Sequence, residues 1–211
     1  PYDFSADDGA VYFGSTRQAP ATSVRFPSIT LFQNVYQVPV KGGRAKLVSA
    51  AGMDFVKLSP NGQQMVFQDR KGGEDPWRKH HTSSVTRDVW LYDLKKNTYQ
   101  ALTNEEIEHR EPVFAADGEA VFYLSEKDGT FNIYKKGLEA NTIRRQLTKF
   151  TKNPVRHLSA SGNNTLAFTQ DGSIYTLAEG EAPQKLRIMI NTDSGLPNVK
   201  NLPLTGNIQE F

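Results

Sequence analysis

The middle of the sequence holds the densest group of side chains that could bind a charged ligand. Between Gln68 and Arg87 lie several cations, two histidines and a tryptophan: Arg70, Lys71, Trp77, Arg78, Lys79, His80 and His81. Cationic side chains can hold a peptide carboxylate through charge-assisted hydrogen bonds, and arginine can do so with two parallel bonds. The alternative is a solvated loop in which Glu74 and Asp75 partly neutralise these cations.

Two further basic segments could contribute to the same substrate site. Arg156 and His157 fall in an expected first strand, where a packed, hydrogen-bonded histidine is the alternative to a ligand-binding one. Arg110 lies in the segment His109–Glu111, which we expect to be a loop at the rim of the site. The three glutamates before this segment are expected to lie on a solvated turn: Glu105, Glu106 and Glu108.

None of these residues forms a pattern that supports catalysis or metal binding. Ser83 and Ser84 follow the two histidines, but a nucleophile needs a base held in hydrogen-bond geometry and a third group that orients the base. Adjacent histidines on an extended chain point apart, and no third zinc ligand is evident. The chain has no cysteine, which excludes thiol catalysis and disulfides. We therefore expect no catalytic residue, no metal and no cofactor.

A repeated pattern of short strands must position these residues. Each repeat has a tight turn at a glycine that follows Asp, Asn or Ser: Asp8-Gly9, Asn61-Gly62, Asp117-Gly118 and Ser161-Gly162. Such turns need a positive φ, which these residues permit. A later strand carries one large aromatic residue per repeat, at Tyr36, Trp90, Tyr134 and Tyr175. We expect these aromatics to be equivalent and to fill the gaps between neighbouring repeats.

Each repeat also has a β-branched residue before the aromatic and a leucine in a fourth strand. The β-branched residues Val35, Val89, Ile133 and Ile174 lie 54, 44 and 41 residues apart, and the leucines are Leu47, Leu102, Leu147 and Leu186. Four strands at a period of about forty residues are typical of a propeller blade. We therefore predict an all-β fold, a β-propeller of four-stranded antiparallel blades.

The repeat spacing divides the chain into four blades and a tail. The blades are predicted at about 1–49, 50–104, 105–149 and 150–188, and residues 189–211 are predicted to be a linker with the first strand of a following or closing blade. Insertions in repeat proteins gather on one face, often the binding face. If the ring is partial, its exposed blade edges could also support self-association.

The repeat resembles the TolB-like, or WD40-like, propeller repeat. The resemblance lies in the Asp-Gly turn, in Asn132-Ile133-Tyr134, and in the closing Leu-Thr pairs at Leu102 and Leu147. The stretch 69–93 is similar to the propeller of bacterial tricorn-type S41 serine peptidases, and 198–206 is similar to their crossing between propeller regions. In that family, tandem propellers precede a PDZ module and a catalytic domain.

The resemblance implies that the chain gates or positions a peptide or protein substrate for a protease domain elsewhere in the parent chain. The protease and PDZ modules would then be its partners, in the periplasm or another extracytoplasmic space. The alternative is a TolB-like protein-binding propeller of the cell envelope with no enzyme attached.

Composition narrows the possible partners further. The chain has 211 residues and a net charge of +2, too small to argue for nucleic acid. No apolar run approaches the roughly 20 residues that a membrane helix needs, so no membrane span is predicted. It begins at Pro1 rather than Met and shows no signal peptide, so we expect it to be a piece of a longer protein.

Overall fold

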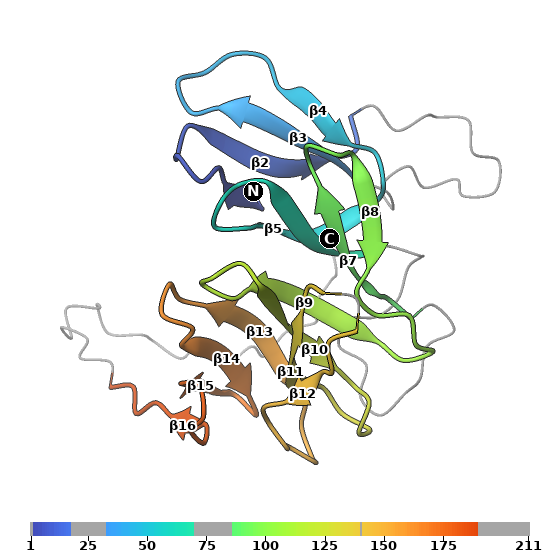
Figure 1. Ribbon diagram of the computed structural model, residues 1–211. Helices are drawn as coiled ribbons and strands as arrows, with labels where there is room; N and C mark the ends of the chain where they lie inside the picture. Colours follow the sequence, from blue (N-terminus) through green and yellow to red (C-terminus); the bar gives the residue numbers. More distant parts are fainter. Residues whose placement is uncertain (1, 18–32, 70–85, 140, 190–211) are drawn as a thin grey trace, which may run out of the picture.

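The computed structural model describes residues 2–17, 33–69, 86–139 and 141–189, and Figure 1 shows its ribbon. The described residues form sixteen strands in four antiparallel sheets of four strands each, with no helix among them. The predicted all-β fold of four-stranded blades is confirmed, and we number the sheets as blades 1 to 4. Among these residues, no helix is long and apolar enough to cross a membrane.

Within each blade the strands pair in chain order. Blade 1 contains β1 (Asp3–Phe4), β2 (Ala10–Ser15), β3 (Asn34–Pro39) and β4 (Lys46–Ser49). Blade 2 contains β5 (Met53–Leu58), β6 (Gln64–Asp69), β7 (Val89–Asp93) and β8 (Thr98–Ala101). Blade 3 contains β9 (His109–Phe114), β10 (Ala120–Ser125), β11 (Asn132–Gly137) and β12 (Arg145–Gln146). Blade 4 contains β13 (Val155–Ala160), β14 (Leu166–Gln170), β15 (Ser173–Leu177) and β16 (Gln184–Lys185).

The antiparallel order gives every blade two distinct ends. At one end, which we call the insertion end, the second strand connects to the third and one blade connects to the next. The tight turns between first and second strands lie at the opposite end. The first strands of successive blades contact one another, β1 with β5, β5 with β9, and β9 with β13 (Figure 1). Residues at the start of these strands therefore gather at the insertion end.

The tight turns follow the prediction in two blades and depart from it in the other two. Gly62 and Gly118 have positive φ angles of 68° and 73°, as predicted. In blade 1 the left-handed residue is Asp8, with φ of 55°, and in blade 4 it is Asn164, with φ of 63°. Short Asp and Asn side chains tolerate this conformation because they can bond locally to the backbone. All four blades therefore have the tight turn, but the residue with the left-handed conformation differs between blades.

The third-strand aromatics occupy equivalent places, as predicted. The strand register sets Tyr36 opposite Phe13, Trp90 opposite Phe67, Tyr134 opposite Tyr123, and Tyr175 opposite Phe168. Trp90, Tyr134 and Tyr175 pack into the three joints between consecutive blades. Tyr36 lies on the face of blade 1 that points away from blade 2. The Arg17 guanidinium lies 4.9 Å from the centre of its ring.

Three of the fourth strands end before the leucine that was predicted to lie in them. Leu102, Leu147 and Leu186 each follow the last residue of their strand, and their amides still donate to third-strand carbonyls. Leu47 lies inside β4 but is 49% exposed, and Val48 packs against the joint instead. The leucine of blade 1 is therefore not equivalent to Leu102, because the register shifts between β3 and β4.

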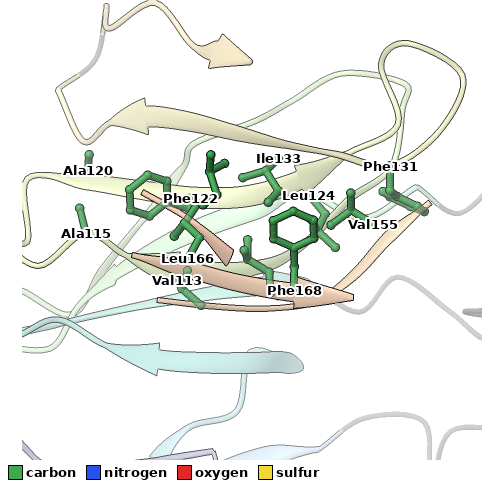
Figure 2. Close-up of a cluster of buried hydrophobic side chains, with 12 residues drawn as sticks. Val113, Ala115, Ala120, Phe122, Leu124, Phe131, Ile133, Val155, Leu166 and Phe168 are labelled. Carbon is green, nitrogen blue, oxygen red and sulfur yellow. The ribbon is translucent and has the colours of Figure 1, made fainter. Parts of the chain in front are cut away.

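Among the residues that the structure describes, the largest apolar cluster fills the joint between blades 3 and 4. Phe122, Leu124 and Ile133 of blade 3 pack against Leu166 and Phe168 of blade 4 (Figure 2). The exposure of the β-branched residue in each third strand shows whether that face of the blade is covered by other residues. Val35, Val89 and Ile133 are fully buried, whereas Ile174 of blade 4 is 39% exposed.

Candidate ligand-binding site at the insertion end

The structure describes three of the ten predicted site residues, and all three lie near the starts of first strands. Arg110 is the second residue of β9, and Arg156 and His157 are the second and third residues of β13. The other seven lie outside the described residues: Arg70, Lys71, Trp77, Arg78, Lys79, His80 and His81.

Arg156 and His157 line an open hollow of about 460 Å³ at the insertion end of blade 4. The remaining lining comes from the segment before β13 and from the end of β14 with the turn that follows it, namely Asn153, Pro154, Thr169, Gln170, Asp171 and Gly172. The His157 side chain is exposed and that of Arg156 is half-buried. The hollow therefore presents a guanidinium and an imidazole to solvent on the same short segment.

Hydrogen bonds between the two sides fix the wall of this hollow. The Asn153 side-chain amide donates to the Asp171 carboxylate at 2.7 Å. The Gln170 side-chain amide donates to the Asn153 backbone carbonyl at 3.2 Å. The Thr169 hydroxyl donates to the Arg156 carbonyl at 3.2 Å. These bonds tie the start of β13 to the turn after β14, so the Arg156 backbone is held while its side chain reaches the hollow.

Arg110 lies in a buried ion network rather than at an open surface. It is 7% exposed, its Nε donates to Glu108 Oε1 at 2.6 Å, and its guanidinium lies 5.3 Å from the Phe131 ring centre. Arg87 Nη1 donates to the same carboxylate oxygen at 2.7 Å. One carboxylate thus joins two guanidiniums from different blades.

The expectation that Glu108 lies on a solvated turn is wrong. Its side chain is fully buried, because Arg87 and Arg110 supply the charged partners that a buried carboxylate needs. Burial alone would raise the pKa of Glu108, but the two guanidiniums outweigh burial and hold that pKa below its usual value. Glu106 is exposed as expected, and the partly exposed Glu105 accepts a bond from Arg144 Nη2 at 2.7 Å.

His109 is a buried titratable residue that the sequence placed on a loop. It is the first residue of β9, is fully buried, and meets the Tyr123 ring edge-on at 5.6 Å between centres. Neither ring nitrogen has a hydrogen-bond partner within the described chain, although Nε2 lies 3.5 Å from Glu105 Oε2. Burial, opposed by the nearby carboxylates, lowers the pKa of His109 from 6.5 to about 4.

Among the described residues, the arrangement at this hollow can bind an anionic group. No group of three or more His, Asp or Glu side chains in this part of the chain is placed to hold a metal ion. Arg156 and His157 supply donors for a carboxylate.

Solved structures with the same blades identify the class of fold. A TolB-type protein of Agrobacterium tumefaciens superposes with a TM-score of 0.66 at 14% identity, covering 86% of this chain and 62% of that protein. TolB from Acinetobacter baumannii gives 0.61 at 17%, covering 87% and 42%. Tricorn protease gives 0.52 at 16%, covering 90% and 22%. The chain is a β-propeller of TolB-like blades.

The sequence comparison narrows this class to one family. The family described as the tricorn protease N-terminal beta propeller domain matches residues 1–182, and the chain belongs to it. Tricorn protease of Thermoplasma volcanium is 25% identical over 138 residues, which cover 62% of this chain and 13% of that protein. The predicted resemblance to TolB-like and tricorn propellers is confirmed, and the chain spans a small part of its curated relative.

Proposed function

We propose that this chain is the non-catalytic propeller domain of a tricorn-like protease, and that it binds and positions peptide substrate for catalytic residues elsewhere in the parent chain. The observation that carries the proposal is the hollow at the insertion end, where Arg156 and His157 face solvent together. Membership of the tricorn propeller family supports the protease context.

The chemistry of the hollow favours the carboxylate end of a peptide. Arg156 can donate two parallel hydrogen bonds to a carboxylate, and His157 can donate a third. The seven cationic, histidine and tryptophan candidates between β6 and β7 lie outside the described residues, and they belong to this proposal as the sequence predicted them. Arg110 does not line the hollow, and in this proposal it acts indirectly, through the network that it forms with Glu108.

Peptide binding tests this function directly. Fluorescence anisotropy would compare labelled peptides that end in a free carboxylate with the same peptides ending in an amide. We expect the free carboxylate to bind about tenfold more tightly, corresponding to about 1.4 kcal/mol, and Arg156→Gln with His157→Gln to remove the difference. The matched control is Arg44→Gln, since Arg44 is exposed near the β3–β4 turn at the opposite end. Equal affinity of both peptides for the unaltered chain overturns the proposal.

A second candidate function is a TolB-like protein-binding propeller with no enzyme attached. The higher TM-scores to TolB, 0.66 and 0.61 against 0.52 for tricorn protease, favour it. The reading frame beyond Phe211 distinguishes the two, because the first function requires protease and PDZ modules downstream and the second does not. Both candidates imply an extracytoplasmic location, which fractionation of the native protein would test.

We also propose that the chain self-associates through its exposed blade edges. Ile174 precedes Tyr175, which packs into the joint with blade 3, so strand alternation puts Ile174 on the opposite face of blade 4. Ile174 is 39% exposed, whereas the equivalent residues of the other blades are fully buried. Light scattering over a range of concentrations would show the dimer, and Ile174→Lys should abolish it. A concentration-independent monomer would exclude this contact.

A further inference from the structure

The first strands of blades 2, 3 and 4 share a strained backbone position. The third residues of β5, β9 and β13 are Phe55, Glu111 and His157, with positive φ angles of 52°, 49° and 58°. At each of these positions the pairing with the second strand shifts register, as in a β-bulge. A left-handed conformation at a residue other than glycine is strained and persists only where neighbours hold it.

In blades 3 and 4 the groups that hold the bulge come from the preceding blade. The Glu111 amide donates to Gln68 Oε1 of blade 2 at 3.1 Å. The Leu158 amide, next to the bulge residue of blade 4, donates to Glu111 Oε2 at 2.8 Å. The His157 amide also donates toward the same carboxylate. Glu111 is therefore the bulge residue of β9, and its side chain also binds the bulge of β13 in the next blade.

We propose that Glu111 is the positioning residue of the candidate peptide site, because its carboxylate clasps the β13 bulge and thereby orients Arg156 and His157 toward the hollow. The proposal rests on the function proposed above. It assigns blade 3 a role in a hollow whose lining residues all belong to blade 4 or to the segment that leads into it.

The electrostatics of the clasp make it sensitive to acid. Burial raises the pKa of Glu111, against the opposing effects of the Leu158 and His157 amides and of two neighbouring charges. Those charges are Arg110 on β9 itself and His157 on β13, while Gln68 of β6 contacts the Glu111 amide rather than the carboxylate. A protonated carboxyl is a weaker acceptor than a carboxylate. The clasp should therefore loosen as Glu111 gains its proton.

The amide proton of Leu158 provides a direct measurement on the unaltered chain. An amide that donates to a carboxylate shifts when that carboxylate titrates, so we expect a pH titration of this proton by NMR to follow Glu111. In Glu111→Gln the carboxyl is gone, and the curve should lose the step that belongs to this carboxyl. A Leu158 shift that stays flat with pH in the unaltered chain, or a titration curve that is the same in Glu111→Gln, overturns the clasp.

Peptide affinity tests the positioning role. Glu111→Leu should weaken binding of a carboxylate-ended peptide at least fivefold, and Glu111→Gln should restore it to within twofold, because its amide oxygen still accepts a bond. The matched control is Asp3→Leu, since Asp3 Oδ2 accepts the Leu58 amide at 3.0 Å across the joint of blades 1 and 2. This control removes the same kind of bond far from the hollow and should leave affinity unchanged.

The possible outcomes distinguish failure of the positioning role from failure of the proposed peptide-binding function. If the unaltered chain binds peptide and Glu111→Leu binds equally well, only the positioning role fails. If Asp3→Leu weakens binding as much as Glu111→Leu, general loosening of the propeller explains both and the role also fails. If the unaltered chain binds no peptide, the proposed function fails together with the positioning role, and the Leu158 titration still decides whether the clasp exists.

Discussion

The two joints that blade 3 makes with its neighbours are built from different chemistry. Toward blade 4 it contributes to the largest apolar cluster among the described residues, which includes Phe122 of blade 3 and Phe168 of blade 4. Toward blade 2 it combines a smaller apolar cluster with the buried network around Glu108 and the buried His109. Apolar packing has no strict directional requirement, whereas buried charges need each partner in place. The first joint should respond to lost volume and the second to lost charge and to acid.

The largest expected effect is loss of volume in the joint of blades 3 and 4. Phe168 is 1% exposed and stacks on Tyr175, with 5.6 Å between ring centres. Phe168→Ala should lower the free energy of unfolding by about 4 kcal/mol, measured by urea denaturation. The control is Ile143→Ala, at a position that is 89% exposed, expected to cost less than about 0.5 kcal/mol. Similar losses for both variants would show that the joint is not the source of stability.

Loss of one charge should have the next largest effect, at the joint of blades 2 and 3. Glu108→Gln removes the carboxylate that Arg87 and Arg110 both bind, while keeping the size of the side chain. We expect a loss of about 3 kcal/mol in the free energy of unfolding, because two buried guanidiniums lose their shared counter-charge. Glu106→Gln, at an exposed position of the same segment, should change stability by less than about 0.5 kcal/mol. A mild effect of Glu108→Gln would mean that hydrogen bonding, not charge, holds the network.

Acid should act on the same joint through His109. The pKa of His109 falls from 6.5 to about 4 on folding because of burial, so below pH 6.5 the unfolded chain takes up a proton that the folded chain excludes. Its contribution to stability is complete above pH 6.5 and is lost as the pH falls toward 4, by about 2 kcal/mol at pH 5. Urea denaturation between pH 7 and pH 4 should show this loss relative to His109→Met. Other titrating groups are common to both chains, so parallel curves would exclude His109 as the sensor.

The sequence predicted the blades better than the joints, because a blade is a local pattern. The turns and the aromatic positions recur in the chain, so Trp90 and Tyr134 could be placed as equivalent without coordinates. The burial of Glu108 depends on arginines that meet it from two blades, and a cluster of glutamates indicates only a solvated turn. Aligning the first strands would have revealed His109, since it takes the fully buried place of Met53 and Val155.

The strand that carries Arg156 and His157 was predictable, but the geometry of this strand was not. The repeat placed Arg156 and His157 on the first strand of blade 4, and the structure does the same. The left-handed conformation of His157 has no local signal, because it is neither glycine nor asparagine. It depends on Glu111, which lies in the preceding blade and meets β13 only after the joint forms. Contacts of this kind follow from packing between repeats.

The smallest expected effect comes from an ion pair at the edge of the same joint. Glu105 lies three residues before Glu108 and pairs with Arg144, but the two side chains are 39% and 21% exposed. The hydrogen bonds from Arg144 hold the pKa of Glu105 below its usual value. Glu105→Gln should nevertheless cost less than about 1 kcal/mol, because solvent screens the pair, and added salt should reduce that cost further. Glu105→Gln and Glu108→Gln are the same substitution in one short segment, so urea denaturation of both isolates the effect of burial. Equal losses would mean that the joint depends on its number of ion pairs and not on where they are buried.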